Sequence, residues 1–367
     1  MTPADGKARL ALGLMSGTSL DGIDAALLWT DGERLAEPGG FLSAPYESDL
    51  RERLRALLGS DPAAAERAPV EADLTRAHAE IIDLLLEKER ITASKIKIIG
   101  FHGHTLFHAP DDRRTVQIGD GELLAAVIGR PVVNDFRSAD MILGGQGAPL
   151  APLYHRARAH TLGHPLTVLN IGGVANVTWL GPDDSDILAF DTGPGVALLD
   201  DWVSGEGRGR FDRDGALARA GRCNEKALRA LMESAFFGRP PPKSLDRNDF
   251  RSDAVKGLGA ADAAATLTAF TAAAVAAACA HLPAPPDRWL VTGGGRHNPA
   301  IMDQLRARLG APVEPVESVG WRGDALEAEA FAYLAVRHLR GLPLSLPSTT
   351  GCREPAQGGR LWRPPAG

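Results

Sequence analysis

Apolar and polar stretches alternate near the start of the chain in a pattern typical of strands joined by turns. An apolar run at residues 10–15 enters a turn of Gly, Thr and Ser, and a second run at residues 23–29 leaves it. This pattern predicts two strands joined by a loop, and a third strand is expected at residues 40–44. Apolar side chains recur at helical spacing between residues 70 and 89, which predicts a helix there.

The rest of the chain alternates short apolar strands with helices. Further strands are expected at residues 95–101, 131–134, 166–171, 174–180, 187–191 and 289–292. Further helices are expected at residues 121–128, 147–160, 195–202, 224–237, 260–282, 298–309 and 323–340. The segment from residue 353 onward is rich in Pro, Gly and Arg, so we expect it to be loosely ordered. Strands that alternate with helices indicate an α/β protein.

A strand–glycine turn–strand unit occurs twice, at residues 10–29 and again at residues 166–180. The repetition predicts two related α/β domains that flank an active-site cleft. We expect an N-terminal domain at residues 1–135 and a C-terminal domain at residues 136–345. The tail at residues 346–367 is expected to pack back on the first domain.

Length and composition agree with this organisation. A chain of 367 residues exceeds what one core usually supports, and the net charge of −6 argues against nucleic acid or an anionic membrane as the main partner. Only Cys223, Cys279 and Cys352 are present, too few and too scattered for a disulfide framework, which favours a reducing, cytoplasmic setting. The helix at residues 260–282 is long enough to span a membrane, but it is mostly Ala and Thr and contains Asp262, so we interpret it as a buried helix of a soluble protein.

The first turn carries the strongest candidate chemistry. Its residues are Gly17, Thr18, Ser19, Leu20, Asp21, Gly22, Ile23 and Asp24. Backbone N–H groups and hydroxyls in such a turn can face an anion, and a carboxylate beside it can hold a divalent cation against phosphate. The lysine-containing P-loop motif is absent from the sequence. We therefore predict a phosphate loop of a kinase or ATPase, with a plain tight turn as the alternative.

Two more glycine-rich turns follow expected strands. Asp191 ends one strand and precedes Gly193 and Gly195, where open α/β sheets present chemistry and a helix N-terminus is available to an anion. The alternative is that Asp191 only caps the helix. A second strand runs into Gly293, Gly294 and Gly295, where backbone without side chains lets a base or phosphate approach closely.

Several polar residues remain open between two or more interpretations. His102, His104 and His108 could bind zinc, contact a polar substrate or be ordinary loop histidines. Arg137 could pair with an acidic substrate group, or form a structural salt bridge to Asp135 or Asp140.

Two charged sites in the second half of the chain also have more than one interpretation. Lys243 could contact phosphate or be an exposed loop lysine with no specific role. Glu327 and Glu329 lie two positions apart on an expected helix, so at most one of them faces the cleft.

A series of motifs resembles a known family. MSGTSLDGID, HGHTLFH, VQIGD, NDFR…GGQGAPL, LNIGGVANV, FDTGPG, PPKS and TGGGRHN occur in this order. They are similar to those of the anhydro-N-acetylmuramic acid kinases, which belong to the sugar-kinase/actin-like ATPase superfamily with ribonuclease H-like domains. The resemblance runs from about residue 10 to residue 351, nearly the whole chain.

The resemblance implies an ATP- and Mg²⁺-dependent kinase of peptidoglycan recycling. Such an enzyme opens the 1,6-anhydro ring of anhydro-N-acetylmuramic acid with water and phosphorylates O6, which gives N-acetylmuramic acid 6-phosphate and ADP. Its partners would be the sugar and ATP, with a homodimer as a possible assembly and neither nucleic acid nor membrane involved.

By motif position, the resemblance also implies roles for individual residues. Residues 17–24 would bind the ATP phosphates, with Asp21 toward Mg²⁺, and Asp191 would be the catalytic base. Further nucleotide contacts are expected at Gly172, Gly173, Gly293, Gly294 and Gly295. Substrate contacts are expected at His104, Thr105, Asp135, Arg137 and Glu327.

Three positions depart from the family pattern. Val196 stands where the family usually has Asn, His104 stands where it has Gln, and Asp246 stands where a Gly is common. These departures concern the part of the site that is expected to bind the sugar. Another sugar kinase of the same superfamily, or a nucleotide-binding regulator without catalysis, therefore remains an alternative.

Overall fold

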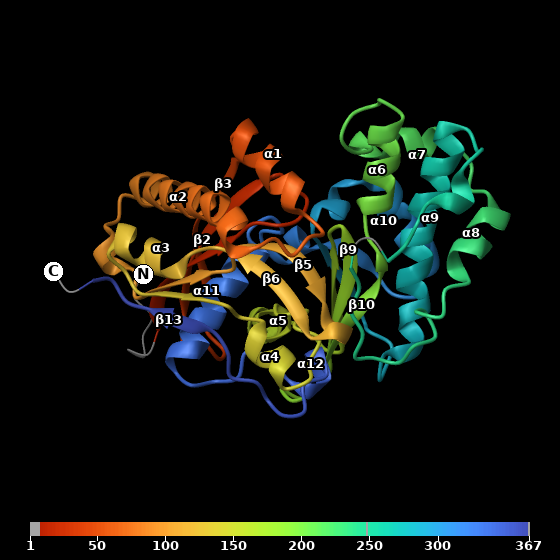
Figure 1. Cartoon of the computed structure of the whole chain (residues 1–367). Coiled ribbons are helices and arrows are strands. Elements are labelled where there is room, and N and C mark those ends of the chain that lie inside the picture. The colour runs from red at the N-terminus through yellow and green to blue at the C-terminus, as the bar shows by residue number, and fades with distance from the viewer. Residues whose placement is uncertain (1–7, 247–248, 366–367) are drawn as a thin grey trace. The chain divides into compact units, whose positions relative to one another are not determined.

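A computed structural model describes residues 8–246 and 249–365 and divides the chain into two compact units. Unit 1 comprises Met1–Thr161 and Ala325–Gly367, and unit 2 comprises Leu162–Asp324. In Figure 1 the two parts of unit 1 have the colours of the two ends of the scale, and unit 2 has the colours of its middle. The ends of the expected domains, at residues 1–7 and 366–367, lie outside the described residues.

The central sheet of unit 1 has the strand order β13-β7-β4-β1-β2-β3. Its strands are β1 (Arg9–Met15), β2 (Gly22–Thr30), β3 (Ala36–Pro45), β4 (Ile98–Phe101), β7 (Val132–Asn134) and β13 (Arg360–Trp362). β1, β2 and β3 are antiparallel neighbours, whereas β4 lies parallel to β1 and β7 parallel to β4. A separate hairpin is formed by β5 (His104–Ala109) and β6 (Arg114–Ile118).

The sheet of unit 2 repeats this plan, with the order β10-β9-β8-β11-β12. Its strands are β8 (Leu166–Ile171), β9 (Val174–Leu180), β10 (Ile187–Pro194), β11 (Trp289–Thr292) and β12 (Val313–Pro315). Again the first strands are antiparallel, and β11 lies parallel to β8 and β12 parallel to β11. Apart from the additional edge strand β13 in unit 1, the two sheets have the same strand order and directions, which confirms the expected α/β fold of two related units.

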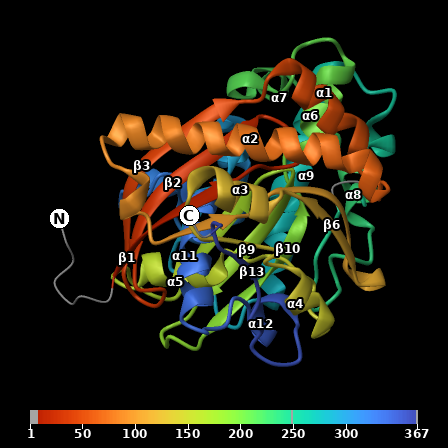
Figure 2. The ribbon, with the colours of Figure 1, turned by 60° about the vertical axis from the view of Figure 1, so that its left-hand side comes forward.

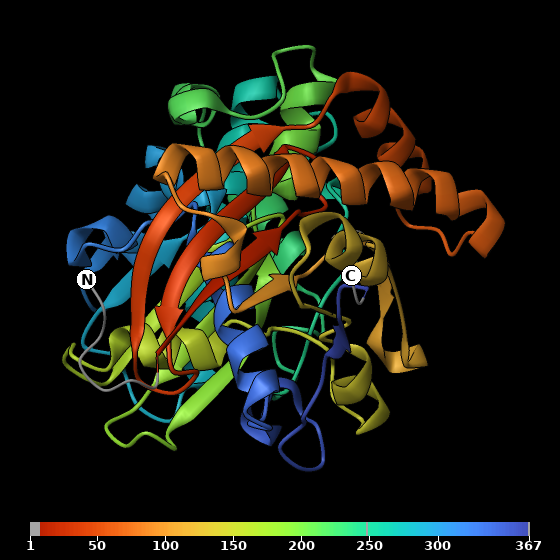
Figure 3. The ribbon, with the colours of Figure 1, turned by 90° about the vertical axis from the view of Figure 1, so that its left-hand side faces the viewer.

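Helices cover both faces of the unit 1 sheet. They are α1 (Ser48–Leu57), α2 (Ala64–Glu89), α3 (Gly121–Ile128), α4 (Ser138–Ile142), α5 (Pro152–Ala159), α11 (Leu326–Leu339) and α12 (Pro347–Thr350). α2 lies across the antiparallel strands (Figure 2), and in Figure 3 the same helix crosses in front of them. Leu12 and Leu14 of β1 share a core with α2. Gly13 between them faces α11, as the alternation of a strand requires.

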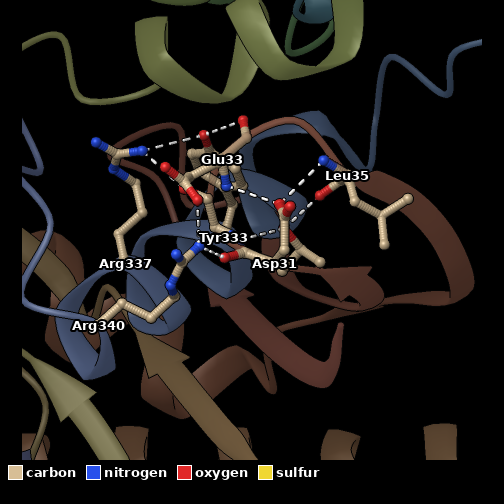
Figure 4. Close-up of polar contacts among 8 residues, drawn as sticks. Asp31, Glu33, Leu35, Tyr333, Arg337 and Arg340 are labelled. Carbon is tan, nitrogen blue, oxygen red and sulfur yellow. Dashed lines mark hydrogen bonds and ion pairs between the residues drawn. The ribbon is translucent and has the colours of Figure 1, made fainter. Parts of the chain in front are cut away.

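A polar cluster fixes α11 to the β2–β3 turn (Figure 4). The Tyr333 hydroxyl donates to the Glu33 carbonyl at 2.8 Å, and Arg337 Nη1 donates to the Gly32 carbonyl at 2.7 Å. Arg340 pairs with the Glu33 carboxylate at 2.6 Å. These bonds attach a helix near the end of the chain to a turn near its beginning.

In unit 2, a long apolar helix forms the centre of the core. α9 (Ala260–Ala278) packs against α6 (Ala197–Gly205), α7 (Ala216–Ala220), α8 (Glu225–Met232) and α10 (Pro299–Arg308), as Figure 1 also shows. Together with the turn that follows it, the segment Ala260–His281 is long and apolar enough to cross a membrane. However, 67% of its most apolar window is buried within the fold. It is the expected buried helix.

The observed division of the chain differs from the expected one. Residues 136–161 and helix α11 belong to unit 1, because Tyr154 of α5 donates to Glu329 of α11 and α11 lies on β1, β2 and β4. The interpretation of the tail as loosely ordered is wrong, because β13 pairs antiparallel with β7 and Ser345 forms a bridge with Ala356. Some expected helices are also shorter: α5 begins at Pro152, and α8 ends at Met232.

Candidate functional site

The first glycine-rich turn connects β1 to β2 and presents polar groups to solvent. Leu20 is buried with a φ of 57°, and its amide donates to the Gly17 carbonyl at 3.1 Å. Thr18, Ser19 and Asp21 on the same turn are exposed. The apolar Leu20 side chain thus anchors the turn in the core while its polar neighbours remain accessible, an arrangement suited to binding phosphate.

The base of this turn is tied to the His-Gly-His segment. The hydroxyl of Ser16, which is buried, donates to the Gly103 carbonyl at 3.0 Å. Tyr46 packs nearby, with its hydroxyl 3.5 Å from His104 Nδ1. Burial raises the pKa of Tyr46 above its ordinary value, and the carboxylate of Asp24 raises it further. Tyr46 is therefore a neutral hydrogen-bonding group beside the turn.

The turn has the donors that a magnesium ion bound together with ATP would need. Mg²⁺ is usually held by one or two carboxylates together with substrate phosphates, and Asp21 places an exposed carboxylate on the turn. Among the described residues, no group of three or more His, Cys, Asp or Glu side chains could hold a metal ion by itself. The residues present fit a cation shared with a nucleotide, and they do not fit a zinc site at the three histidines.

In unit 2, Asp191 lies where the pairing of β10 with β9 changes register. Its side chain is 5% exposed, and its Oδ2 accepts a hydrogen bond from the Leu245 amide at 2.8 Å. The Asp191 amide in turn donates to the Lys243 carbonyl at 3.0 Å. The segment at residues 243–245 therefore holds Asp191 through its backbone and fixes one oxygen of the carboxylate. Asp191 does not simply cap α6, which begins six residues later.

Lys243 is not an exposed loop lysine. Its side chain is buried, and Nζ donates to the Phe236 carbonyl at 3.0 Å and lies 4.5 Å from the centre of the Phe236 ring. Burial lowers the pKa of Lys243 to about 8; Arg239 lowers it further, whereas Asp191 opposes the shift. The ammonium group anchors the segment that holds Asp191.

The turn at Gly172 and Gly173 lies directly against the start of α6. The amides of Gly195 and Val196 donate to the Gly173 and Gly172 carbonyls at 2.9 and 2.8 Å, and the Ala197 amide donates to Gly173 at 3.3 Å. The amides of residues 195–197 are therefore already bonded to the turn, and the expectation that this helix N-terminus is available to an anion stays a prediction for the amides that follow them. A Cβ at residue 195 would lie 2.0 Å from the Gly172 carbonyl oxygen, so this packing requires glycine.

The three glycines after β11 have different surroundings. A Cβ at residue 293, where φ is +78°, would lie 2.3 Å from Asn170 Oδ1, and one at residue 295 would lie 2.3 Å from Ile171. A Cβ at residue 294 would meet no atom within 4 Å. Gly293 and Gly295 therefore let the turn pack on the end of β8, whereas Gly294 is exposed with open space beside it.

The histidines of the His-Gly-His segment are buried. His104 is fully buried, and burial lowers its pKa to about 4, as it does for the neighbouring His78. Thr105 is half-buried and its hydroxyl accepts from Gln117 at 3.3 Å. His104 therefore contacts the protein interior, and Thr105 is the more accessible of these two expected substrate residues.

Arg137 contacts two uncharged groups. Its Nη1 donates to the Gly147 carbonyl at 2.6 Å, and its Nη2 lies 2.9 Å from His102 Nε2. The two carboxylates considered as salt-bridge partners have other roles. Asp135, which is exposed, accepts from the Ser138 hydroxyl at 2.5 Å, and Asp140, which is buried, accepts from the Gly147 amide at 2.7 Å.

The two glutamates at the start of α11 point in different directions, as their spacing predicts. Glu327 is exposed, whereas Glu329 is fully buried and accepts a hydrogen bond from the Tyr154 hydroxyl at 2.5 Å. Glu327 is thus the exposed glutamate of the two, and its expected contact with the substrate stays a prediction.

Within unit 1 the structure brings together the first glycine-rich turn, the His-Gly-His segment and Arg137. Within unit 2 it brings together Asp191, Lys243 and the Gly172–Gly173 turn. Sequence reasoning missed Tyr46, which belongs to no recognisable motif, and it assigned no role to Gln117 although VQIGD contains it. It flagged His102 and Asp140 without assigning them their structural partners.

Comparison with known proteins gives extensive matches. The model of the family described as anhydro-N-acetylmuramic acid kinase matches residues 9–364. A protein of that name from Rhodospirillum rubrum is 56% identical over 354 residues, covering 96% of this chain and 94% of its own. One from Acidiphilium cryptum is 57% identical over 357 residues, covering 96% and 98%. Among solved structures, component A of the (R)-2-hydroxyglutaryl-CoA dehydratase of Acidaminococcus fermentans covers 90% of this chain and 98% of its own, with 13% identity and a TM-score of 0.48. No functional conclusion rests on that last likeness.

Proposed function

Because this chain belongs to the anhydro-N-acetylmuramic acid kinase family, we propose that it couples hydrolysis of the 1,6-anhydro ring to phosphorylation of O6. The substrates would be 1,6-anhydro-N-acetylmuramic acid, ATP and water, and the products N-acetylmuramic acid 6-phosphate and ADP. The reaction would return an amino sugar of the cell wall to metabolism.

The observation that carries this proposal is the placement of Asp191. One carboxylate oxygen accepts the Leu245 amide, and the side chain is almost completely buried. A carboxylate fixed in this way can remove a proton from a water molecule in a defined direction.

In the proposed reaction, Asp191 takes a proton from the water that attacks C1 of the sugar. The C1–O6 bond breaks, and O6 attacks the γ-phosphorus of ATP, so that ADP leaves. Ring opening of this kind resembles inverting glycoside hydrolysis, which ordinarily needs a second carboxylic acid to protonate the leaving oxygen. Phosphorylation of O6 replaces that protonation, so one carboxylate is sufficient.

The phosphates of ATP would be held mainly by positioned backbone amides and hydroxyls. The exposed groups of residues 17–22 and the open backbone of Gly294 are suited to this role. Mg²⁺ bound with ATP would be held by Asp21 and would neutralise phosphate charge. The proposed contacts to the sugar are Thr105, Asp135, Arg137 and Glu327, and Arg137 would bind its lactyl carboxylate. The buried His104 would support these residues from the protein interior.

The proposal is tested by incubating the protein with Mg·ATP and the anhydro sugar in ¹⁸O-water and analysing the product by mass spectrometry. We expect a phosphosugar heavier than the phosphorylated anhydro sugar by one water, with ¹⁸O at C1. Authentic N-acetylmuramic acid 6-phosphate in the same ¹⁸O-water measures spontaneous exchange at C1.

The other outcomes identify the alternatives. A phosphorylated sugar with the anhydro ring intact would show an ordinary sugar kinase, and ATP binding with no phosphosugar would show a regulator. Either result would overturn the proposed function.

A further inference from the structure

We infer that His102 positions the Arg137 guanidinium and thereby gives the enzyme its preference for sugars that carry a carboxylate. The inference rests on the proposed function, in which Arg137 faces the lactyl carboxylate of the substrate. His102 is a positioning residue in this account, since it acts on the substrate through Arg137.

The hydrogen bonds of His102 assign its tautomer. Nδ1 lies 3.0 Å from the Gly103 carbonyl oxygen, which can only accept, so Nδ1 carries the proton. Nε2 therefore presents a lone pair, which accepts from Arg137 Nη2 at 2.9 Å and from Gln117 Nε2 at 3.0 Å. Both nitrogens of a nearly inaccessible imidazole are used.

The absence of charge on this acceptor matters for the binding of an anionic ligand. Burial holds the pKa of His102 well below its ordinary value, and the charge of Arg137 lowers it further, so the imidazole stays neutral. The second acceptor, the Gly147 carbonyl, is also uncharged. A carboxylate in either place would form an ion pair with the guanidinium, whereas these two contacts orient it without adding a negative charge.

The imidazole ring is itself rigidly held. The His102 amide donates to the Leu14 carbonyl at 3.2 Å, and the ring lies 4.5 Å, centre to centre, from the ring of Phe331 on α11. Leu14 belongs to β1, the strand that enters the phosphate turn. His102 therefore fixes Arg137 relative to that turn.

The second acceptor is fixed from the other side. The Gly147 amide donates to Asp140 Oδ2 at 2.7 Å, and Asp140, which is 1% exposed, also accepts from the hydroxyls of Thr350 and Ser345. The Gln146 amide donates to the Thr350 carbonyl at 2.7 Å. The ordered segment near the C-terminus thus fixes the loop whose carbonyl holds Arg137.

The test compares two sugars that differ in the carboxylate. In the variant His102→Phe the ring volume is kept and the acceptor is lost. For 1,6-anhydro-N-acetylmuramic acid we expect kcat/KM to fall about 10- to 100-fold, mainly through KM, which is the usual worth of one hydrogen bond to a charged group. For 1,6-anhydro-N-acetylglucosamine, which lacks the lactyl carboxylate, we expect a change within about twofold.

Two further variants separate positioning from folding. His102→Gln restores an acceptor and should recover part of the selectivity for the acid. His155→Phe replaces another buried histidine of unit 1 and should leave the ratio between the two sugars unchanged. If the neutral sugar is not turned over, calorimetric binding of both sugars gives the same ratio.

Two results would overturn the inference: an equal loss on both sugars in His102→Phe, which would indicate a structural role only, or no loss on the acid. Failure of the wild-type protein to phosphorylate either sugar would instead overturn the proposed function, independently of His102.

Discussion

At the scale of single residues, the surroundings of Asp191 and Lys243 determine what each can do. Asp191 keeps one oxygen in a hydrogen bond to a backbone amide, so its orientation does not depend on a mobile side chain. The ammonium group of Lys243 satisfies a backbone carbonyl in the segment next to it and lies against an aromatic ring. The lysine thus acts on Asp191 through its own backbone carbonyl, which accepts a hydrogen bond from the Asp191 amide.

Replacement of Asp191 by Asn should test the proposed base directly. The amide keeps the size of the side chain but cannot accept a proton from water, and loss of a general base typically costs about 10²–10⁴-fold in rate. We expect turnover to fall by at least this factor while ATP binding, measured by calorimetry, is kept. Near-normal phosphosugar formation by Asp191→Asn would exclude Asp191 from the role.

At the scale of elements, α11 lies in backbone contact with the sheet of unit 1. A Cβ at Gly13 of β1 would come within 1.8 Å of the Ala328 carbonyl oxygen, and one at Gly100 of β4 within 2.0 Å of the Phe331 carbonyl oxygen. The polar cluster of Tyr333, Arg337 and Arg340 fixes the other end of the same helix (Figure 4). Neither glycine can be replaced without moving α11.

The variant Gly100→Ala should therefore be destabilised. Overpacking of a close contact typically costs about 1–3 kcal/mol, and a backbone carbonyl cannot move aside as a side chain can, so we expect the upper part of this range. Urea unfolding measures the change. Gly310→Ala is the control, because a Cβ there meets no atom within 4 Å. Equal stability of the two variants would show that α11 does not pack this closely.

At the scale of the whole molecule, buried histidines are concentrated in unit 1. Burial lowers the pKa of His78, His104 and His155 to about 4, and holds that of His102 well below its ordinary value. All of them belong to unit 1. An unfolded chain binds protons at these positions below about pH 6.5, whereas the folded chain resists protonation until about pH 4. Folded pKa values below the unfolded ones make stability fall as the pH falls through this window.

Acidification from pH 7 to pH 5 should therefore weaken unit 1. The shifts of His78, His104 and His155 each correspond to on the order of 3 kcal/mol when the pH passes through the whole window, so only part of it is lost by pH 5. Hydrogen exchange, corrected for the intrinsic effect of pH, should show protection falling in unit 1. In His155→Phe this loss should be smaller. Unchanged protection of unit 1 across the range would contradict the prediction.

The sequence by itself determined the local elements and the family. Strand periodicity predicted β1, β2, β8, β9 and β11 close to their observed bounds, because period and turn chemistry are properties of neighbouring residues. Helical spacing predicted the end of α2, but the helix begins six residues earlier than expected. The long motifs predicted the family that the comparisons show. Glu327 and Glu329 were correctly placed on different faces, since helical spacing alone settles that question.

Only the tertiary structure decided which polar groups are accessible and which are already bonded. His104 is enclosed, the amides of residues 195–197 bond to the Gly172–Gly173 turn, and Lys243 is buried. The tail is ordered because β13 pairs with β7, more than 200 residues earlier in the chain. Each of these outcomes depends on partners distant in sequence, and burial and hydrogen bonding by such partners leave no periodic signal in the local pattern of residues.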